Sequence, residues 1–298
     1  MSQFDLNLAV QQYTTNVQLL VQQKGSRLRP TVMSDTHYGK QAVAVDQYAP
    51  VTATKRTGRY QPLMPYDTQN DRRWVTPVDY DWNDLIDNFD KLRLLNDPTS
   101  YYVMNAVNAM GRSMDDEIIN AFFGTALTGE TGSTSTSFLS ANQVDVAYGA
   151  AAATGLNVRK LLRAKKILMG YDIDLDADTI YCVISAAQHE DLLNEIQIVN
   201  TQYNNVNNQP ILKDGKLQSF LGINFIHSER LPLNGSSYRR IPVYCKSGMH
   251  LGMWNEIQTS IDQRKDLSSL PYQVYTMGTY GATRTEEKKI VELPCAES

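Results

Sequence analysis

The side chains best suited to acid–base catalysis or metal binding are four histidines, His37, His189, His227 and His250. They are scattered over separate predicted elements. His189 is followed by Glu190, but no second histidine stands four positions after His189, so the helical zinc-protease pattern is absent. We therefore interpret the four histidines as structural residues.

A run of alternating aspartates has the spacing that begins a calcium loop. Its members are Asp172, Asp174, Asp176 and Asp178. The sixth position of the loop is Ala177, where the sharp turn needs glycine, and the twelfth is Val183, where a bidentate glutamate belongs. The pattern predicts a solvated acidic turn, and we expect no metal or cofactor.

Other chemical signatures are also missing from the sequence. It contains no GxxxxGK[ST], GxGxxG or GxSxG motif. The three cysteines, Cys182, Cys245 and Cys295, are far apart and form no CxxC pair, so we interpret them as free thiols. The sequence thus indicates a protein that is not an enzyme, and an enzyme with an unrecognised site is the alternative from a different class.

Charged residues that could bind another protein chain form two groups. The basic group lies between residues 36 and 80 and contains Lys55, Arg56, Arg59, Arg72 and Arg73. It indicates either a solvated charged loop or an arm that pairs with acidic surface on a neighbouring subunit. The acidic group is Asp115 and Asp116, which point about 100° apart on a helix and so do not form an acid–base pair. We expect them to pair with basic side chains of this chain or of a neighbour.

Composition limits the classes of partner. The 298 residues include 28 Lys and Arg against 32 Asp and Glu, a net charge of -4, which argues against strong nucleic-acid binding. No apolar run reaches about 18 residues, and the N-terminal segment has no basic region before an apolar core. We expect a protein made in the cytoplasm that does not contact a membrane.

The element that organises the chain is a helix predicted over residues 98–123. Asp97 and Pro98 suit its start, and Gly124 suits its end. Between them apolar residues recur every three or four positions: Val103, Ala106, Val107, Met110, Met114, Ile118, Ala121 and Phe122. A helix of this length with one buried stripe would act as a strut.

The rest of the chain mixes shorter elements without regular alternation or repeats, which predicts an α+β fold. We expect a two-stranded excursion over residues 36–80 with its tip at 61–68, and a flexible loop rich in Gly, Ser and Thr after the long helix. Helices are predicted over 158–169 and 186–196, and a hairpin turning at Asp214 and Gly215. Further strands are predicted at 179–185, 241–254, 270–284 and 288–293.

This order of parts resembles the major capsid proteins of tailed double-stranded DNA bacteriophages, which have the HK97-like fold. Local phrases carry the resemblance: RTGRY, DRRWVTPVDYDWNDLIDNFDKLRLLNDPTS, AMGRSMDDEIINAFFGTALTGETG, SAAQHEDLL, FLGINFIHSERLP and TYGATRTEEKKIVEL. They cover most of the chain, from about Thr36 to Leu293.

The resemblance implies a domain plan. Residues 1–35 would be an N-terminal arm and 36–80 the extended loop, or E-loop. Residues 81–139 and 249–298 would form the peripheral P domain with spine helix 98–123, and 140–248 the axial A domain. Some relatives join a lysine to an asparagine between subunits; Lys55 and Asn255 are the positions to consider, but we expect noncovalent closure.

The resemblance also implies a function and partners. Hexamers and pentamers of the chain would close an icosahedral virion capsid around double-stranded DNA, touching that DNA nonspecifically. A separate scaffolding protein and a portal protein are implied, and a decoration protein is an option. An encapsulin-like nanocompartment shell shares the fold and is the nearest alternative.

Overall fold

The computed structural model describes residues 20–60, 62, 65–87, 99–195, 212–213 and 215–297. The chain divides into two compact units. The first unit comprises Met1–Ser26, Asp79–Ser113 and Asn255–Thr279; the second comprises Arg27–Val78, Met114–Trp254 and Tyr280–Ser298.

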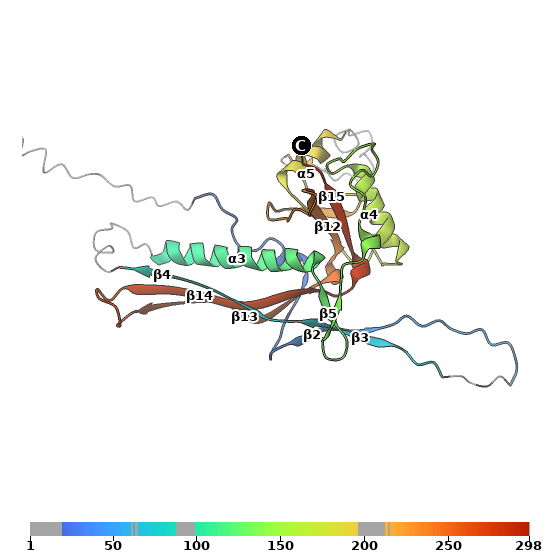
Figure 1. Ribbon diagram of the computed structural model, residues 1–298, viewed down its shortest axis with the longest axis horizontal. Helices are drawn as coiled ribbons and strands as arrows, with labels where there is room; N and C mark the ends of the chain where they lie inside the picture. The colour runs from blue at the N-terminus through green and yellow to red at the C-terminus, as the bar shows by residue number, and fades with distance from the viewer. Residues whose placement is uncertain are drawn as a thin grey trace, which may run out of the picture. The chain divides into compact units, whose positions relative to one another are not determined.

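The longest described helix, α3, spans Thr99–Phe123 and confirms the helix predicted over residues 98–123 (Figure 1). Asp97 and Pro98, the residues expected at its start, lie outside the described residues. At its end the Gly124 amide donates to the Asn120 carbonyl at 2.9 Å, and the helix stops where the sequence predicts. Five residues of the predicted stripe are buried, Ala106, Met110, Met114, Ile118 and Phe122, but Val107, also predicted to be buried, is 37% exposed.

Two shorter helices also confirm the sequence prediction. Helix α4 is Val158–Gly170, and Asn157 caps it by accepting the Lys160 amide at 2.8 Å. Helix α5 is Ala186–Asn194, and it begins with a capping box formed by Ser185 and Gln188. Side-chain caps of this kind satisfy amides that have no partner inside the first helical turn.

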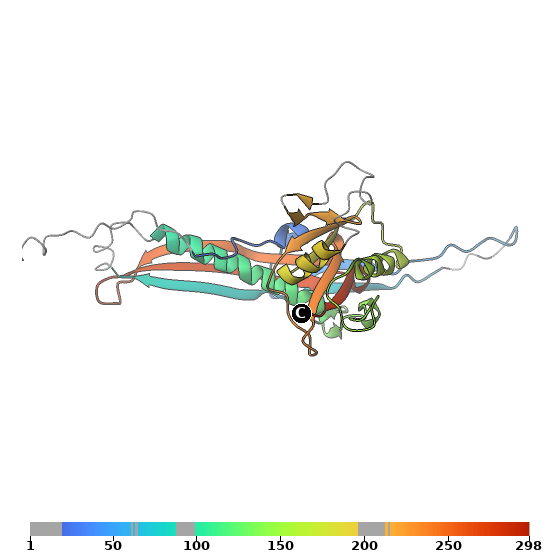
Figure 2. The same ribbon diagram turned by 90° about the horizontal axis from the view of Figure 1, so that it is seen from above.

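One four-stranded sheet has the order β1-β13-β14-β4. Its strands are β1 (Met33–Thr36), β13 (Met249–Gln263), β14 (Tyr272–Arg284) and β4 (Val78–Ile86). Strands β13 and β14 run side by side in both ribbon views (Figures 1 and 2). The first five residues of β13 are buried and its last residues are exposed, so the strand leaves the core along its length.

A five-stranded mixed sheet lies in the second unit, in the order β10-β11-β7-β12-β15. Its strands are β10 (Ser219–Phe220), β11 (Ile223–His227), β7 (Ile180–Ile184), β12 (Arg239–Cys245) and β15 (Ile290–Cys295). Strand β11 is parallel to β7, whereas β12 is antiparallel to both β7 and β15. All six residues of β15 are buried, so the end of the chain contributes directly to this core.

A third sheet carries the predicted excursion, in the order β2-β3-β5-β6. Strands β2 (Ala42–Tyr48) and β3 (Asn70–Val75) pair antiparallel, as expected, with a register shift between Val43 and Val45. The prediction of a flexible loop after α3 was wrong, because part of that segment forms a hairpin on β3. Its strands are β5 (Ala126–Thr128) and β6 (Thr134–Thr136).

An aromatic side chain explains why this Gly- and Thr-rich segment is ordered. The Trp74 ring nitrogen donates to the Gly129 carbonyl at 2.7 Å. The backbone of Gly132, at φ +71°, lies so close to that ring that an added Cβ would sit 3.0 Å from Trp74 Cγ. These contacts hold the turn between β5 and β6 against Trp74.

The remaining elements are short. Strands β8 (Leu212–Lys213) and β9 (Lys216–Leu217) form the hairpin predicted around Gly215; Asp214 lies outside the described residues. The 3₁₀ turns are η1 (Arg29–Thr31), η2 (Ser140–Asn142), η3 (Lys246–Gly248) and η4 (Glu287–Lys289). No helix in the described ranges is long and apolar enough to span a membrane.

Candidate functional site

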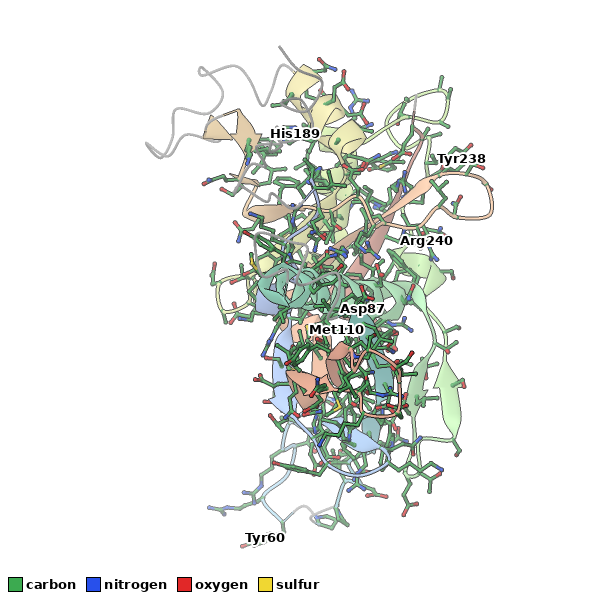
Figure 3. All side chains as sticks on the ribbon, turned by 90° about the vertical axis from the view of Figure 1, so that its left-hand side faces the viewer. Tyr60, Asp87, Met110, His189, Tyr238 and Arg240 are labelled. Atoms are coloured by element: carbon green, nitrogen blue, oxygen red, sulfur yellow. The ribbon has the colours of Figure 1, made fainter. Side chains whose placement is uncertain are left out.

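The basic residues predicted to meet other subunits lie on the segment that leaves β2 and returns at β3. Lys55, Arg56 and Arg59 are exposed, and Tyr60, 93% exposed, lies at the outer end of this segment (Figure 3). Arg56 donates to nearby backbone, with Nε 2.9 Å from the Gly58 carbonyl. Within the described part of the chain no acidic side chain pairs with Lys55, Arg56 or Arg59.

The two other basic candidates lie at the root of the same hairpin and have partners within the chain. Arg72 Nε is 2.9 Å from Asp46 Oδ1 on β2, and both side chains are about half exposed, at 50% and 56%. Arg73 makes two bonds to Glu287, Nη1 to Oε1 at 2.7 Å and Nη2 to Oε2 at 2.5 Å. Arg73 is only 5% exposed, so this paired charge belongs to the interior.

The two acidic candidates on α3 also have partners within the chain. Asp115 is fully buried and accepts the backbone amides of Arg27 at 3.0 Å and Leu28 at 3.1 Å. Asp116 forms a bidentate pair with Arg230. The expectation of contacts between subunits therefore rests on the exposed residues of the hairpin, whereas Arg73 and Asp115 are buried.

A buried arginine holds the end of α3. Arg284, on β14, is 1% exposed, and its Nη1 donates to the carbonyls of Ala121 and Phe122 at 3.2 Å and to that of Gly124. These carbonyls have no partner within the helix, so the guanidinium replaces the missing amides. Nothing in the sequence near Arg284 signals this role, because its partners lie some 160 residues away.

A buried lysine fastens the end of the chain to α4. Lys160 Nζ donates to the carbonyls of Thr154 at 2.7 Å, Gly155 at 2.9 Å and Pro294 at 2.9 Å. Burial lowers the pKa of Lys160, and the negative potential of neighbouring groups opposes that effect. The ammonium's three donors are all used, so this is a structural clamp.

The histidines do not meet in one cluster. His37 and His250 form one pair, whereas His189 and His227 line a cavity of about 670 Å³ with Arg27 and Lys216. His189 Nε2 accepts the Leu217 amide at 3.2 Å. No serine, cysteine or carboxylate is among the described residues lining this cavity, although His227 Nε2 lies 2.8 Å from Glu229 Oε1.

The remaining predicted residues also have structural surroundings. Of the four aspartates, Asp178 bonds Ser247, while Asp174 accepts the Asp176 amide at 3.0 Å. In the described ranges no three His, Cys, Asp or Glu side chains gather as a metal site. The cysteines Cys182, Cys245 and Cys295 are all unpaired and buried.

Comparisons with known proteins give one consistent result. The family model described as phage capsid protein matches residues 6–297. No curated protein matches by sequence.

Solved capsids share the fold at low sequence identity. The capsid of Cyanophage P-SCSP1u aligns with a TM-score of 0.75 and 15% identity, covering 98% of this chain and 94% of that one. The capsid of Cyanophage Pam1 aligns with a TM-score of 0.73 and 13% identity, covering 97% of each chain. The capsid of Ralstonia phage GP4 aligns with a TM-score of 0.71 and 10% identity, covering 98% of this chain and 96% of that one.

These structural matches show the α+β, HK97-like fold predicted from the order of parts. The family match extends over nearly all of the sequence. The chain belongs to the phage capsid protein family and is a shell-forming major capsid protein of the virion.

Proposed function

We propose that the chain assembles as hexamers and pentamers that close an icosahedral shell around double-stranded DNA. In this proposal its function is structural, and it is not an enzyme. The observation that carries this proposal is the exposed basic segment between β2 and β3. Residues 49–66 contain Lys55, Arg56 and Arg59 and no acidic residue. The described residues of this segment, 49–60, 62 and 65–66, are all exposed and none is in a strand, so a neighbouring subunit is its natural support.

The domain plan belongs to the same proposal. Residues 1–35 serve as the N-terminal arm and 36–80 as the E-loop. Residues 81–139 and 249–298 form the P domain, and 140–248 the A domain. The buried Arg73–Glu287 pair supports the E-loop assignment, since it anchors the root of the hairpin while its outer part stays exposed.

Partners follow from the task of closing a shell. A scaffolding protein guides curvature, a portal occupies one vertex, and a decoration protein is an optional addition. Contact with DNA is nonspecific and made through phosphates, which suits a chain with a net charge of -4. The subunit is made in the host cytoplasm before assembly.

Electron microscopy of the purified chain, with and without its scaffolding partner, tests the proposal. Closed shells, or rings of five and six subunits, are the expected result. A uniform monomer under every condition would contradict it. Noncovalent shells gain stability from many repeated weak contacts, so assembly should rise steeply with subunit concentration.

Two variants test the role of the hairpin. Deletion of residues 61–68, some of which lie outside the described residues, should leave a folded subunit that fails to close shells. Triple reversal of Lys55→Glu, Arg56→Glu and Arg59→Glu should lower particle yield at least tenfold. Lys166→Glu on the exposed face of α4 is the charge control, and normal yield from the triple variant would reject the hairpin as an assembly arm.

A further inference from the structure

Two histidines distant in sequence share one hydrogen bond at the start of the hairpin. His37 Nε2 and His250 Nε2 lie 2.7 Å apart. His250, on β13, is 1% exposed, and its Nδ1 has no hydrogen-bond partner. A bond between two imidazole nitrogens needs a proton on one and a lone pair on the other. This contact therefore accommodates one proton between the two nitrogens and not two.

The pair belongs to a small set of contacts that fasten residues 33–39 to β13. Strand β1 pairs in parallel with β13 over only four residues, and three of those four are exposed. Beyond the strand, the His37 amide donates to the Met253 carbonyl at 2.8 Å. The Trp254 ring nitrogen donates to the Gly39 carbonyl at 2.7 Å.

The His37 ring is also held by its fit. Its centroid lies 5.4 Å from the Trp254 ring. A Cβ on Gly252 would sit 2.7 Å from His37 Cδ2, so the absence of a side chain there makes room for the imidazole. With so short a strand, the histidine bond is a substantial part of what keeps this segment on β13.

We propose that His37 and His250 form a pH-sensitive clasp, which is closed while their Nε2 atoms share one proton and opens when both carry one, freeing residues 33–39 from β13. The first proton added to the neutral pair leaves an imidazolium bonded to an imidazole. The second leaves two donors and two like charges facing each other, which removes the bond and adds repulsion.

The other groups around the pair do not cancel that repulsion. Asp35 is the charged side chain of β1 that acts on His250, with Oδ2 3.8 Å from Nδ1, but it is 71% exposed and therefore well screened. Trp254, Gly252 and Gly39 contribute no titratable group. Burial, and then the neighbouring His37, lower the pKa of His250 to about 4, so the second protonation falls in moderately acidic solution.

Hydrogen exchange detected by mass spectrometry tests the clasp on the purified full chain. Labelling times are scaled for the intrinsic pH dependence of exchange, and circular dichroism confirms that the chain remains folded. Peptides covering residues 33–39 should exchange at least tenfold faster at pH 4 than at pH 7.5, while β12 and β15 keep their protection. Equal protection of residues 33–39 at both pH values would overturn the proposal.

Substitutions assign the response to the pair. His37→Gln can still bond His250 but cannot become a second cation, so opening should shift to lower pH or vanish. His37→Lys carries a permanent charge and should expose residues 33–39 already at pH 7.5. The control His227→Gln, at a half-exposed histidine on β11, should behave like the unmodified chain.

The His37→Gln variant tests whether the histidine pair causes the opening, even if the His37→Lys variant fails to fold. Opening of His37→Gln at the same pH as the unmodified chain would show that the acid response has another origin, and would overturn the proposal.

Discussion

Arg73 on β3 and Glu287 in η4 form a two-bonded ion pair between segments 214 residues apart in sequence. The side chains are 6% and 14% exposed, so the charges sit largely away from water. The adjacent Arg72 pairs with Asp46 in solvent instead. Two neighbouring arginines thus provide a direct comparison of a buried and an exposed ion pair in one strand.

Arg73→Ala should lower the free energy of unfolding of the subunit by about 3 kcal/mol, because Glu287, 14% exposed, loses both hydrogen bonds to Arg73 and keeps only Arg284, whose Nε lies 4.0 Å from Glu287 Oε1. Arg72→Ala is the matched control and should cost at most about 1 kcal/mol, as exposed pairs do. Urea unfolding followed by circular dichroism measures both. An equal decrease in the free energy of unfolding for the two variants would show that burial of the Arg73 pair adds nothing to stability.

Lys160→Met should lower the free energy of unfolding by about 3 kcal/mol, because one buried and two partly buried carbonyl oxygens would lose a charged donor. Lys166→Met, on the exposed face of the same helix, should change it by less than about 0.5 kcal/mol. Thermal unfolding of the two variants side by side gives the comparison. An unchanged melting temperature for Lys160→Met would mean that packing replaces the clamp.

Asp115→Asn should cost about 2 kcal/mol, since one of the two oxygens that accept the amides of Arg27 and Leu28 becomes an amide nitrogen. Asp116→Asn breaks only a partly exposed pair with Arg230 and should cost under about 1 kcal/mol. Hydrogen exchange at the Arg27 and Leu28 amides is the specific readout, and it should rise only in Asp115→Asn.

Stability should fall as pH drops from about 6.5 to about 4, in part because of His250. Its pKa is lowered to about 4 in the folded chain from 6.5, so between these values the unfolded chain binds more protons and acid favours unfolding. At about 1.4 kcal/mol per pH unit this amounts to about 3 kcal/mol. His250→Gln should flatten that part of the urea-unfolding profile, and an unchanged slope would assign the acid sensitivity to other groups.

Local signals in the sequence were enough to predict most elements. The stripe ending at Phe122 and the stop at Gly124 predicted α3. The order of these parts was enough to predict the fold class. Capping and periodicity act over a few residues, so they can be found without a structure.

Contacts distant in sequence could not be predicted in the same way. Arg73 was predicted to pair with a neighbouring subunit, whereas it is buried and pairs with Glu287, 214 positions away in the same chain. The hairpin of β5 and β6 was missed in part because it pairs with β3 and contacts Trp74, both distant in sequence. The His37–His250 contact could not be predicted, because it depends on the pairing of β1 with β13.

The three buried cysteines have a practical consequence. Burial raises the pKa of Cys245 and of Cys295 to about 12, and that of Cys182 well above its usual range, so native thiolates are scarce at neutral pH. A cysteine introduced at Tyr60, which is 93% exposed, would then be the preferred target of a maleimide reagent. Each subunit would carry a single addressable handle without any native thiol being removed.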